Sequence, residues 1–406
     1  MQIKKINKDT FIEFSMNHDL TSFYQSIEWV ETKNREYDIL GLYHDENLVG
    51  ASIILYLKTF RKYKIAYASR GFIYDYSNVS DFTIALKEYF KQDKSIIFFR
   101  MDPLIILSSY DKNLNKNTIE DSVKKIEELK KNGFKHFGFN TGYETTQFRF
   151  VHRLLLENSF DKQMESMSKS TKKNIKLAKD YGVKIERANT KKLDTVYELF
   201  EKSVERKNIS NLRKSTYQSI LEQFKDKAVM YLAYIDKSAY TSYLKIKLEE
   251  AHNEYNRVIH LMNKVNVGEK LKKQKETASN LISKYESELE ESKSLEDITY
   301  IGSMISIFYK DEVVSLSSGM DFKYRKFCPK YAMYPAMIED AINNNYKYVN
   351  FLGVKNILDK DDPAYGVYEV KRGFGGETLE YIGEFDLPLR NSLYKLYKIK
   401  ENKERK

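Results

Sequence analysis

The hydrophobic pattern is clearest between residues 241 and 297, where apolar side chains recur at alternating spacings of four and three. This spacing is typical of the seam along which two helices pack in a coiled coil. Gly268 divides the seam into two runs, and glycine tolerates the positive φ that tight reversals often need. The pattern therefore predicts an antiparallel coiled-coil hairpin that buries its own seams. The seam positions are Leu244, Leu248, Ala251, Tyr255, Val258, Met262 and Val265 before the glycine, and Leu271, Ala278, Ile282, Tyr285 and Leu289 after it.

The segments on either side of the hairpin predict a small α+β unit. Residues 228–235, 301–309 and 313–317 are rich in β-branched and aromatic side chains, which favours strands. Apolar positions then recur with helical spacing over residues 331–341, and residues 348–352 favour another strand. The hairpin is thus predicted to interrupt a unit of three strands, a helix and a fourth strand.

The first part of the chain repeats this order. Residues 37–43 and 48–57 predict a β-hairpin, residues 82–90 a helix, and residues 95–99 a strand. Two copies of one element order indicate two similar α+β domains that arose by duplication. The predicted limits are residues 1–155 for the first domain, residues 156–389 for the second domain, interrupted by the arm at 241–297, and residues 390–406 for a basic C-terminal tail.

Composition narrows the setting and the partners. The single cysteine, Cys328, excludes a disulfide framework and a multi-thiolate metal site, which favours a reducing cytoplasm. The first residues lack the apolar stretch of a signal peptide, and no apolar run reaches the roughly 20 residues of a membrane-spanning helix. The formal net charge of +10 favours nucleic acid, phosphorylated metabolites or an anionic membrane surface as partners.

This charge is unevenly distributed. The arm carries a net charge of −1, so the remaining chain carries +11. A helix is predicted over residues 168–182, with Ser168 or Ser170 as its N-cap and with Ile175, Ala178 and Tyr181 facing inward. This helix places four lysines on one face, which suits phosphate binding or, equally, a solvated helix surface. The tail carries Leu393, Leu396 and Ile399 among its cations, a pattern that suits contact with anionic lipid. The four lysines are Lys169, Lys172, Lys173 and Lys176.

Motifs of several enzyme classes are absent from the sequence. It contains no Walker-type phosphate loop, no His-Glu-x-x-His and no Gly-x-Ser-x-Gly. The six histidines are scattered, so we expect no metal site, and Cys328 is interpreted as a structural thiol. In residues 365–376, Lys371 and Arg372 precede Gly373, Gly375 and Gly376, which favours close approach of a ligand or, alternatively, a turn or bulge between strands.

Several short motifs, taken in order over about 360 residues, carry a family resemblance. The chain resembles the Fem family of non-ribosomal peptidyltransferases, the FemA-, FemX- and MurM-type aminoacyltransferases that build peptidoglycan cross-bridges. The inserted arm resembles that of the armed, coiled-coil subgroup. The matching stretches are Gln25-Ser26-x-x-Trp29-x-x-x-Lys33, Tyr67 to Gly71, Met101-Asp102-Pro103, Ser170 to Val183, Tyr331 to Tyr334, Asn350-Phe351-x-Gly353, Val370 to Glu377 and Tyr381 to Phe385.

The resemblance implies two acetyltransferase-like (GNAT) domains and a reaction. Glycine, alanine or serine would pass from aminoacyl-tRNA to the stem-peptide amine of lipid II or UDP-MurNAc-pentapeptide, at the inner face of the cytoplasmic membrane. The donor is a substrate, and no further cofactor is expected. Because an aminoacyl ester is already activated, the reaction needs positioning, loss of a proton and oxyanion stabilisation, but no enzyme nucleophile.

The resemblance also implies roles for individual residues. Lys371 would contact the aminoacyl ester and stabilise the oxyanion, while Lys33 and Arg206 would clamp the phosphates or stem peptide of the precursor. Asp102, at a predicted strand end, is a candidate general base or, alternatively, a structural turn residue. Arg70 belongs to one of the matching motifs and is a further substrate-binding candidate.

Trp29 is a candidate substrate-binding residue or, alternatively, a core residue. The four lysines of the basic helix, together with the arm, are candidates for tRNA contact.

Two departures and several alternatives accompany this interpretation. The family often has Arg-Gly-Pro where this chain has Arg70-Gly71-Phe72, and residues 314–317 lack a tyrosine common in that strand. An acyl-CoA-dependent N-acyltransferase, a non-catalytic RNA- or membrane-binding scaffold and an immunity factor remain open. A homodimer, or a hetero-oligomer with a paralogue, is also open.

Overall fold

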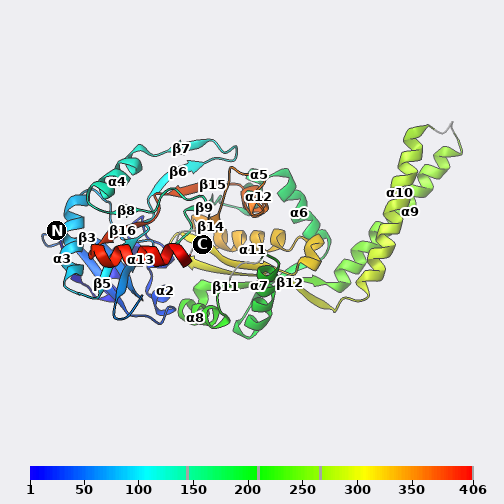
Figure 1. Cartoon of the computed structure of the whole chain (residues 1–406). Helices are drawn as coiled ribbons and strands as arrows, with labels where there is room; N and C mark the ends of the chain where they lie inside the picture. Colours follow the sequence, from blue (N-terminus) through cyan, green and yellow to red (C-terminus); the bar gives the residue numbers. More distant parts are fainter. Residues whose placement is uncertain (143–145, 208–210, 265–267, 405–406) are drawn as a thin grey trace.

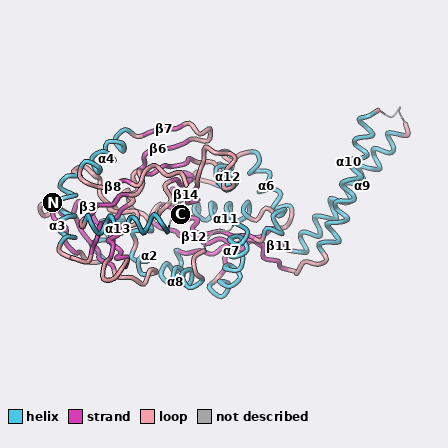
Figure 2. The backbone as a smooth tube through the Cα atoms, in the orientation of Figure 1, coloured by secondary structure: helices cyan, strands magenta, loops and turns pink. Residues whose placement is uncertain are grey.

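A computed structural model describes the chain except for residues 143–145, 208–210, 265–267 and 405–406. Two mixed β-sheets, each flanked by helices, form an elongated body, and a long helical hairpin projects from one end of it (Figure 1). Strands lie between helices in both halves of the body (Figure 2).

The first sheet has helices on both faces. Core clusters place α1 (Lys8–Met16), α2 (Ile27–Glu31) and α13 (Asn391–Glu404) on one face, and α3 (Val79–Lys91) and α4 (Glu120–Lys131) on the other. Neighbouring strands are antiparallel except for the parallel pair β4–β5. In sheet order the strands are β1 (Gln2–Lys5), β2 (Tyr37–His44), β3 (Asn47–Lys58), β4 (Lys64–Ala68), β5 (Ile96–Met101), β16 (Phe385–Pro388) and β8 (Lys135–His136).

The second sheet also contains one parallel pair, β13–β14. Helices α6 (Lys169–Asp180) and α11 (Lys330–Asn343) cover one face, while α7 (Leu193–Lys207) and α8 (Lys214–Phe224) cover the other. In sheet order the strands are β10 (Val183–Ala188), β11 (Ala228–Asp236), β12 (Ile298–Tyr309), β13 (Glu312–Met320), β14 (Tyr348–Val354), β9 (Phe150–Leu155), β15 (Glu377–Tyr381), β6 (Ile106–Tyr110) and β7 (Lys116–Thr118).

The predicted repeat is confirmed. Strands β2, β3 and β4, helix α3 and strand β5 have the same order as β11, β12, β13, α11 and β14. In each copy the helix connects the two strands of the parallel pair. The β13–β14 pairing covers only residues 312–314 and 348–350, after which the register of the two strands is no longer shared.

The two sheets exchange strands along the chain. Strands β6, β7 and β9 precede residue 155 yet belong to the second sheet, and β16 returns to the first sheet near residue 385. The two sheets therefore do not divide the chain at residues 155 and 389. The predicted domain limits at these residues stay a prediction. These crossings tie the two halves of the body together.

The hairpin consists of α9 (Lys237–Met262) and α10 (Glu269–Ser292), inserted between β11 and β12 as expected. The predicted seam is confirmed, since Ala251, Val258 and Ala278 are buried along the packed pair α9–α10, while Leu244 at the base is buried in the core cluster of the second sheet. Val265 lies outside the described residues. Gly268 is the N-cap of α10 with φ −77°, so its expected positive φ is wrong.

The remaining helices are short. Helix α5 (Phe160–Ser166) leads into α6, and α12 (Tyr365–Gly373) follows β14. Within the described ranges, 3-10 turns lie at Phe23–Gln25, Thr190–Lys192, Lys225–Lys227 and Phe322–Phe327. The glycine-containing segment 365–376 is therefore mainly a helix, which corrects the alternative of a turn between two strands.

Candidate active site between the two sheets

A cavity of about 370 Å³ lies between residues 19–24 of the first half and one face of the second sheet. Four cations and three carboxylates line it, so the wall is mixed in charge with a basic excess, which suits an anionic or zwitterionic ligand. The charged lining residues are Arg70, Arg153, Lys310, Lys347, Asp19, Asp311 and Glu312, and aromatic residues include Tyr24, Tyr309, Tyr348 and Tyr381.

Arg70 enters this cavity from the end of β4. Its guanidinium lies over the ring of Tyr381 at 4.7 Å and donates a hydrogen bond to the carbonyl oxygen of Phe148. Its backbone N–H donates to Asp102 Oδ1 at 2.6 Å. Contacts from three elements therefore orient the predicted substrate-binding residue Arg70, and they bring it together with Asp102.

Asp102 is buried behind Arg70. Besides the Arg70 N–H, its carboxylate accepts a hydrogen bond from the Tyr67 hydroxyl at 3.0 Å. Burial, opposed by the charge of Arg70 and assisted by that of Glu384, raises the pKa of Asp102 to about 7. Asp102 is not among the described residues that line the cavity. This geometry favours an anchoring role, and the general-base role stays a prediction.

The raised pKa of Asp102 has a consequence for stability. Between its ordinary pKa of 3.8 and about 7, the native state binds more protons than the unfolded state, so the free energy of unfolding falls as pH rises. In Asp102→Asn this titration is absent. As pH rises through this window, the free energy of unfolding of the variant should therefore increase relative to that of the wild type by up to about 1.4 kcal/mol per pH unit. Urea unfolding at pH 5 and pH 7 measures the difference, and a constant difference would contradict it.

Lys371 lies on α12 at the gap between β13 and β14. The side chain is buried, and Nζ donates to the carbonyl oxygen of Gly353 at 2.7 Å and, more weakly, to that of Leu352 at 3.5 Å. Strand β14 is irregular here, since Leu352 has φ +58° and the register with β9 shifts between Asn350 and Gly353. The ammonium group is thus fixed against strained backbone at the point where the sheet opens.

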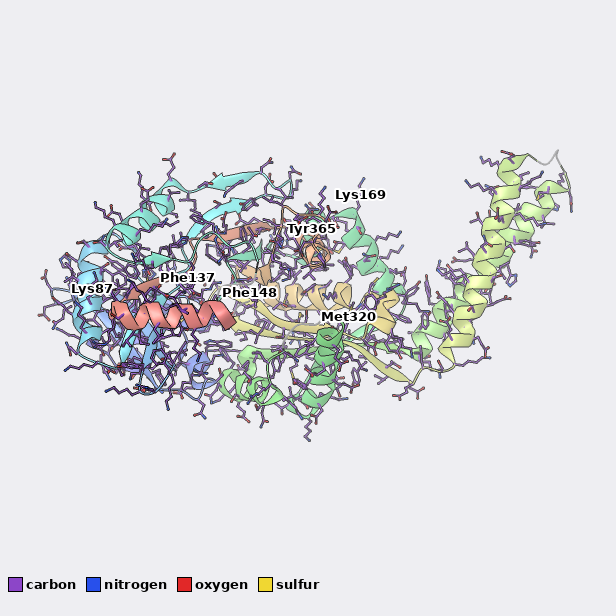
Figure 3. The ribbon with its side chains drawn as sticks, viewed as in Figure 1. Lys87, Phe137, Phe148, Lys169, Met320 and Tyr365 are labelled. Atoms are coloured by element: carbon purple, nitrogen blue, oxygen red, sulfur yellow. The ribbon has the colours of Figure 1, made fainter. Side chains whose placement is uncertain are left out.

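Phe148 connects Lys371 to the cavity. A Cβ at position 353 would overlap the Phe148 ring, so only glycine permits this contact. The carbonyl oxygen of Phe148 accepts the hydrogen bond of Arg70, and the carbonyl oxygen of Gly353 accepts that of Lys371. Figure 3 labels Phe148 in the middle of the body, between the two halves. Arg70 and Lys371 are therefore linked through two neighbouring residues, Phe148 and Gly353.

The basic helix α6 begins beside the segment that carries Lys371. The Ser168 N–H donates to the Gly373 carbonyl oxygen at 2.9 Å, and Ser168 caps α6 as predicted. The predicted inward and outward faces are confirmed, because Ala178 and Tyr181 are buried while most of the lysines are exposed. Lys169, Lys173 and Lys176 are exposed, and Lys172 is half-buried with Nζ 3.2 Å from the Glu165 carbonyl oxygen.

His152 fixes the other end of this segment. Burial lowers the pKa of His152 to about 4, so the ring is neutral near pH 7. Its Nε2 lies 2.8 Å from the Gly375 carbonyl oxygen and its Nδ1 lies 3.0 Å from Thr378 Oγ1. Both ring nitrogens are therefore used to hold the turn that follows α12. Sequence analysis missed His152 because a lone histidine in a strand gives no pattern.

Trp29 packs against two residues of the cavity wall from the first half, and Lys33 lies over its ring. Trp29 is buried, with its ring edge-on to Phe23 at 5.0 Å and to the cavity residue Tyr24 at 5.2 Å. Lys33 Nζ lies 3.4 Å from the centre of the Trp29 ring, and burial together with the charge of Arg35 lowers the pKa of Lys33 to about 8. Trp29 is thus packed as a core residue, and a role in binding substrate directly stays a prediction.

The last two features noted in the sequence are Arg206 in α7 and the tyrosine missing from β13. Arg206 belongs to α7, and its side chain lies outside the described part of the structure. Strand β13 lacks the tyrosine noted above, but Tyr217 of α8 brings its hydroxyl to 2.8 Å from Ser317 Oγ. A phenol from another element therefore reaches the strand where the family tyrosine is missing.

The described residues contain no group of three or more histidine, cysteine or acidic side chains arranged to hold a metal ion. Among the helices in the described ranges, none combines the length and apolarity required to span a bilayer.

Comparison with known proteins identifies the family. A model described as the FemAB family matches residues 6–402. The chain belongs to the FemAB family. It is 25% identical over 413 residues to Aminoacyltransferase FemA of Staphylococcus epidermidis, covering 98% of each chain. It is 27% identical to Aminoacyltransferase FemB of the same species, covering 98% of this chain and 97% of FemB.

A solved structure shows the same fold. The crystal structure of FemX matches with a TM-score of 0.75 at 24% identity, covering 98% of this FemAB chain and 99% of FemX. The expected α+β fold with two similar units is thereby confirmed, and the protein is an aminoacyltransferase. The likeness of each unit to acetyltransferases (GNAT) stays an expectation. Membership of the armed subgroup stays a prediction.

Proposed function

We propose that this FemAB protein transfers glycine, alanine or serine from aminoacyl-tRNA to the stem-peptide amine of a peptidoglycan precursor, with lipid II at the inner membrane face as acceptor. One observation carries the proposal: Phe148 joins Arg70, in a net-basic cavity between the sheets, to Lys371 at the opening of the second sheet. This arrangement places two fixed cations within one connected site, as a transfer between two substrates requires.

The proposed reaction requires little covalent chemistry from the protein. The acceptor amine attacks the ester carbonyl, the new C–N bond forms, and the C–O bond to the tRNA ribose breaks. The amine loses a proton and the leaving ribose oxygen gains one. A buried ammonium such as Lys371 stabilises the oxyanion of the tetrahedral intermediate, because charge interactions strengthen where water is excluded.

The side of Lys371 suits the tRNA donor. A groove of about 1190 Å³ runs between α12, the start of α6 and the turn between β6 and β7. The basic face of α6 continues from this groove. The distal end of the arm adds exposed cations, whereas its base near α10 residues 286–291 is acidic, so we propose that the tip contacts tRNA. The tip cations include Arg257, Lys264, Lys270, Lys272 and Lys273.

The cavity suits the acceptor. Its basic excess matches a pyrophosphate or the carboxylates of a stem peptide. Lys33 stands next to the cavity behind Trp29 and Tyr24, and its pKa of about 8 keeps it mostly protonated at pH 7. We propose that Lys33 and Arg206 hold the precursor while Arg70 orients its reacting end.

The basic face of α6 makes a specific prediction for tRNA affinity. Changing Lys172, Lys173 and Lys176 to glutamate should weaken binding and reduce the slope of log affinity against log salt by about 2–3, because each phosphate contact contributes about 0.9. Filter binding of aminoacyl-tRNA at salt concentrations from about 50 to about 300 mM measures the slope. Reversal of Lys124, Lys130 and Lys131, exposed on α4 of the other half, is the matched control. An unchanged slope in the α6 variant would remove α6 from the tRNA site.

The transfer assay separates the proposed function from its alternatives. Purified protein is incubated with radiolabelled glycyl-, alanyl- or seryl-tRNA, or with acetyl-CoA, and with lipid II or a soluble nucleotide-linked precursor. We expect label to pass from aminoacyl-tRNA to the precursor. Transfer from acetyl-CoA alone would support an acyl-CoA-dependent enzyme instead, and no transfer from any donor would support a scaffold.

A further inference from the structure

The outer face of α13 carries an exposed apolar pair. Leu396 and Ile399, one turn apart, are 54% and 58% exposed. On the opposite side of the helix, Leu393, Tyr394 and Tyr397 pack against the apolar cluster of the first sheet. Both faces of α13 are therefore apolar, but only the inner face has a partner within the described residues. The predicted contact of Leu393 with lipid is accordingly replaced by packing against the sheet.

The charged side chains of α13 also differ between its inner and outer faces. Glu401 turns inward, where it bonds to Arg100 Nη1 at 3.0 Å and pairs with Lys398. Lys395 and Lys400 are exposed beside the apolar pair. The acidic side chain is thus neutralised inside, and the outer face presents cations around Leu396 and Ile399.

The loop between β3 and β4 extends this surface. Phe60 and Tyr63 pack in the same cluster as Leu393, which places the loop beside α13. Arg61 and Lys62, between these two aromatic residues, are exposed. Figure 1 shows α13 along the outside of the first sheet, far from the hairpin. Exposed cations therefore lie both beside the apolar pair on α13 and on the loop that packs next to this helix.

We propose that this face, formed by α13 and residues 59–63, docks on the anionic surface of a lipid bilayer. Leucine and isoleucine enter the boundary between headgroups and acyl chains, while lysine and arginine bind anionic headgroups. A second copy of the chain would bring like charges together, and nucleic acid would leave the apolar pair without a partner. The inference deepens the proposed function and rests on it for its purpose, since a lipid-linked acceptor lies at such a surface.

Vesicle binding tests the docking surface without any need for activity. Full-length protein is sedimented with vesicles of phosphatidylglycerol and phosphatidylcholine, and with phosphatidylcholine alone. We expect selective binding to the anionic vesicles, and a loss of about tenfold or more in partitioning for the double variant Leu396→Gln, Ile399→Gln. A second variant, Lys395→Glu with Lys400→Glu, should lose the preference for anionic lipid. Ile84→Gln, at a site 51% exposed on the other face of the first sheet, is the matched control.

Several outcomes would overturn the inference. Equal binding of the wild type to both kinds of vesicle would contradict the preference for anionic lipid. Equal binding of the wild type and the Leu396, Ile399 double variant would place the contact elsewhere on the protein. Thermal unfolding of each variant confirms that loss of binding is not loss of fold.

Transfer assays with a soluble nucleotide-linked acceptor distinguish the two proposals. Loss of transfer to lipid II alone in the double variant supports both proposals. Vesicle binding with the expected variant effects, in a protein that transfers to no acceptor, supports the docking surface and contradicts the proposed function.

Discussion

Lys371→Met is expected to lower kcat by a factor of about 100 to 1,000, with kcat/KM falling by a similar factor. Methionine retains most of the buried side-chain volume and removes the ammonium group. The interaction lost is with charge that develops only in the transition state, so substrate binding should change little. Single-turnover transfer from aminoacyl-tRNA, with the KM of each substrate, measures the effect.

Some loss of stability should accompany this variant. The carbonyl oxygens of Gly353 and Leu352 lose the hydrogen bonds that Lys371 donates, and a hydrogen bond to a charged group contributes about 1.5–3 kcal/mol. Urea unfolding therefore belongs in the same experiment. Lys360→Met, an exposed lysine in the loop before α12, is the matched control and should retain full activity. Full activity of Lys371→Met would remove Lys371 from the chemistry and leave it a structural role at the gap.

The elements that sequence analysis predicted well are those specified by local pattern. Each half of the arm carries its own regular spacing of apolar residues. The repeated strands and helices carry apolar runs bounded by polar turns. The N-cap Ser168 was predictable because a capping side chain acts within three residues of its own position. Such interactions require no knowledge of the remaining chain.

The site was only partly predictable, because its contacts join distant segments. Phe148 and Arg153 lie in or beside β9, and no spacing in the sequence indicates that this strand enters the second sheet beside β14. The motif residues Arg70 and Lys371 were found through the family resemblance. Their connection through Phe148 depends on strand exchange between the sheets, which local patterns do not encode.

The tail shows the same limit at the level of one helix. Its composition indicated a basic amphipathic segment, but not which apolar side chains face inward. That choice depends on Arg100, 301 residues before Glu401, which draws the acidic side chain toward the sheet. The structure thereby separates Leu393 from Leu396 and Ile399, which sequence analysis had grouped.

The duplicated fold is used differently in its two halves. In the first half, the end of the β4–β5 pair is closed by Asp102, which holds the backbone of Arg70. In the second half, the pairing of β13 with β14 ends at residue 350, and Lys371 binds the buried carbonyl oxygens of Leu352 and Gly353. One copy thus supplies an anchored cation to the cavity, and the other places a buried ammonium group at the end of the strand pairing.

Arg100→Met is expected to destabilise the protein by about 3–5 kcal/mol at pH 8, because it leaves buried carboxylates without their principal cation. Arg100 Nε lies 2.7 Å from Asp386 Oδ1, and Nη1 lies 3.0 Å from Glu401 Oε1 and 3.3 Å from Glu384 Oε1. All four side chains are buried between the first sheet and α13. Lys398, Tyr394 and a backbone N–H retain contacts with the carboxylates, which places the expected loss toward the lower end of this range.

The effect of this variant should depend on pH. Burial already raises the pKa of Asp386 to about 6, whereas Arg100 and Lys398, working against burial, lower the pKa of Glu401 to about 2. Without Arg100 both pKa values should rise, so the carboxylates take up protons at low pH and the penalty shrinks. Urea unfolding at about pH 5.5 and about pH 8 should thus show that the variant loses more of its free energy of unfolding at the higher pH. The exposed Arg35→Met is the control. A loss that is equal at both pH values would show that α13 docks through apolar contacts rather than through this ion network.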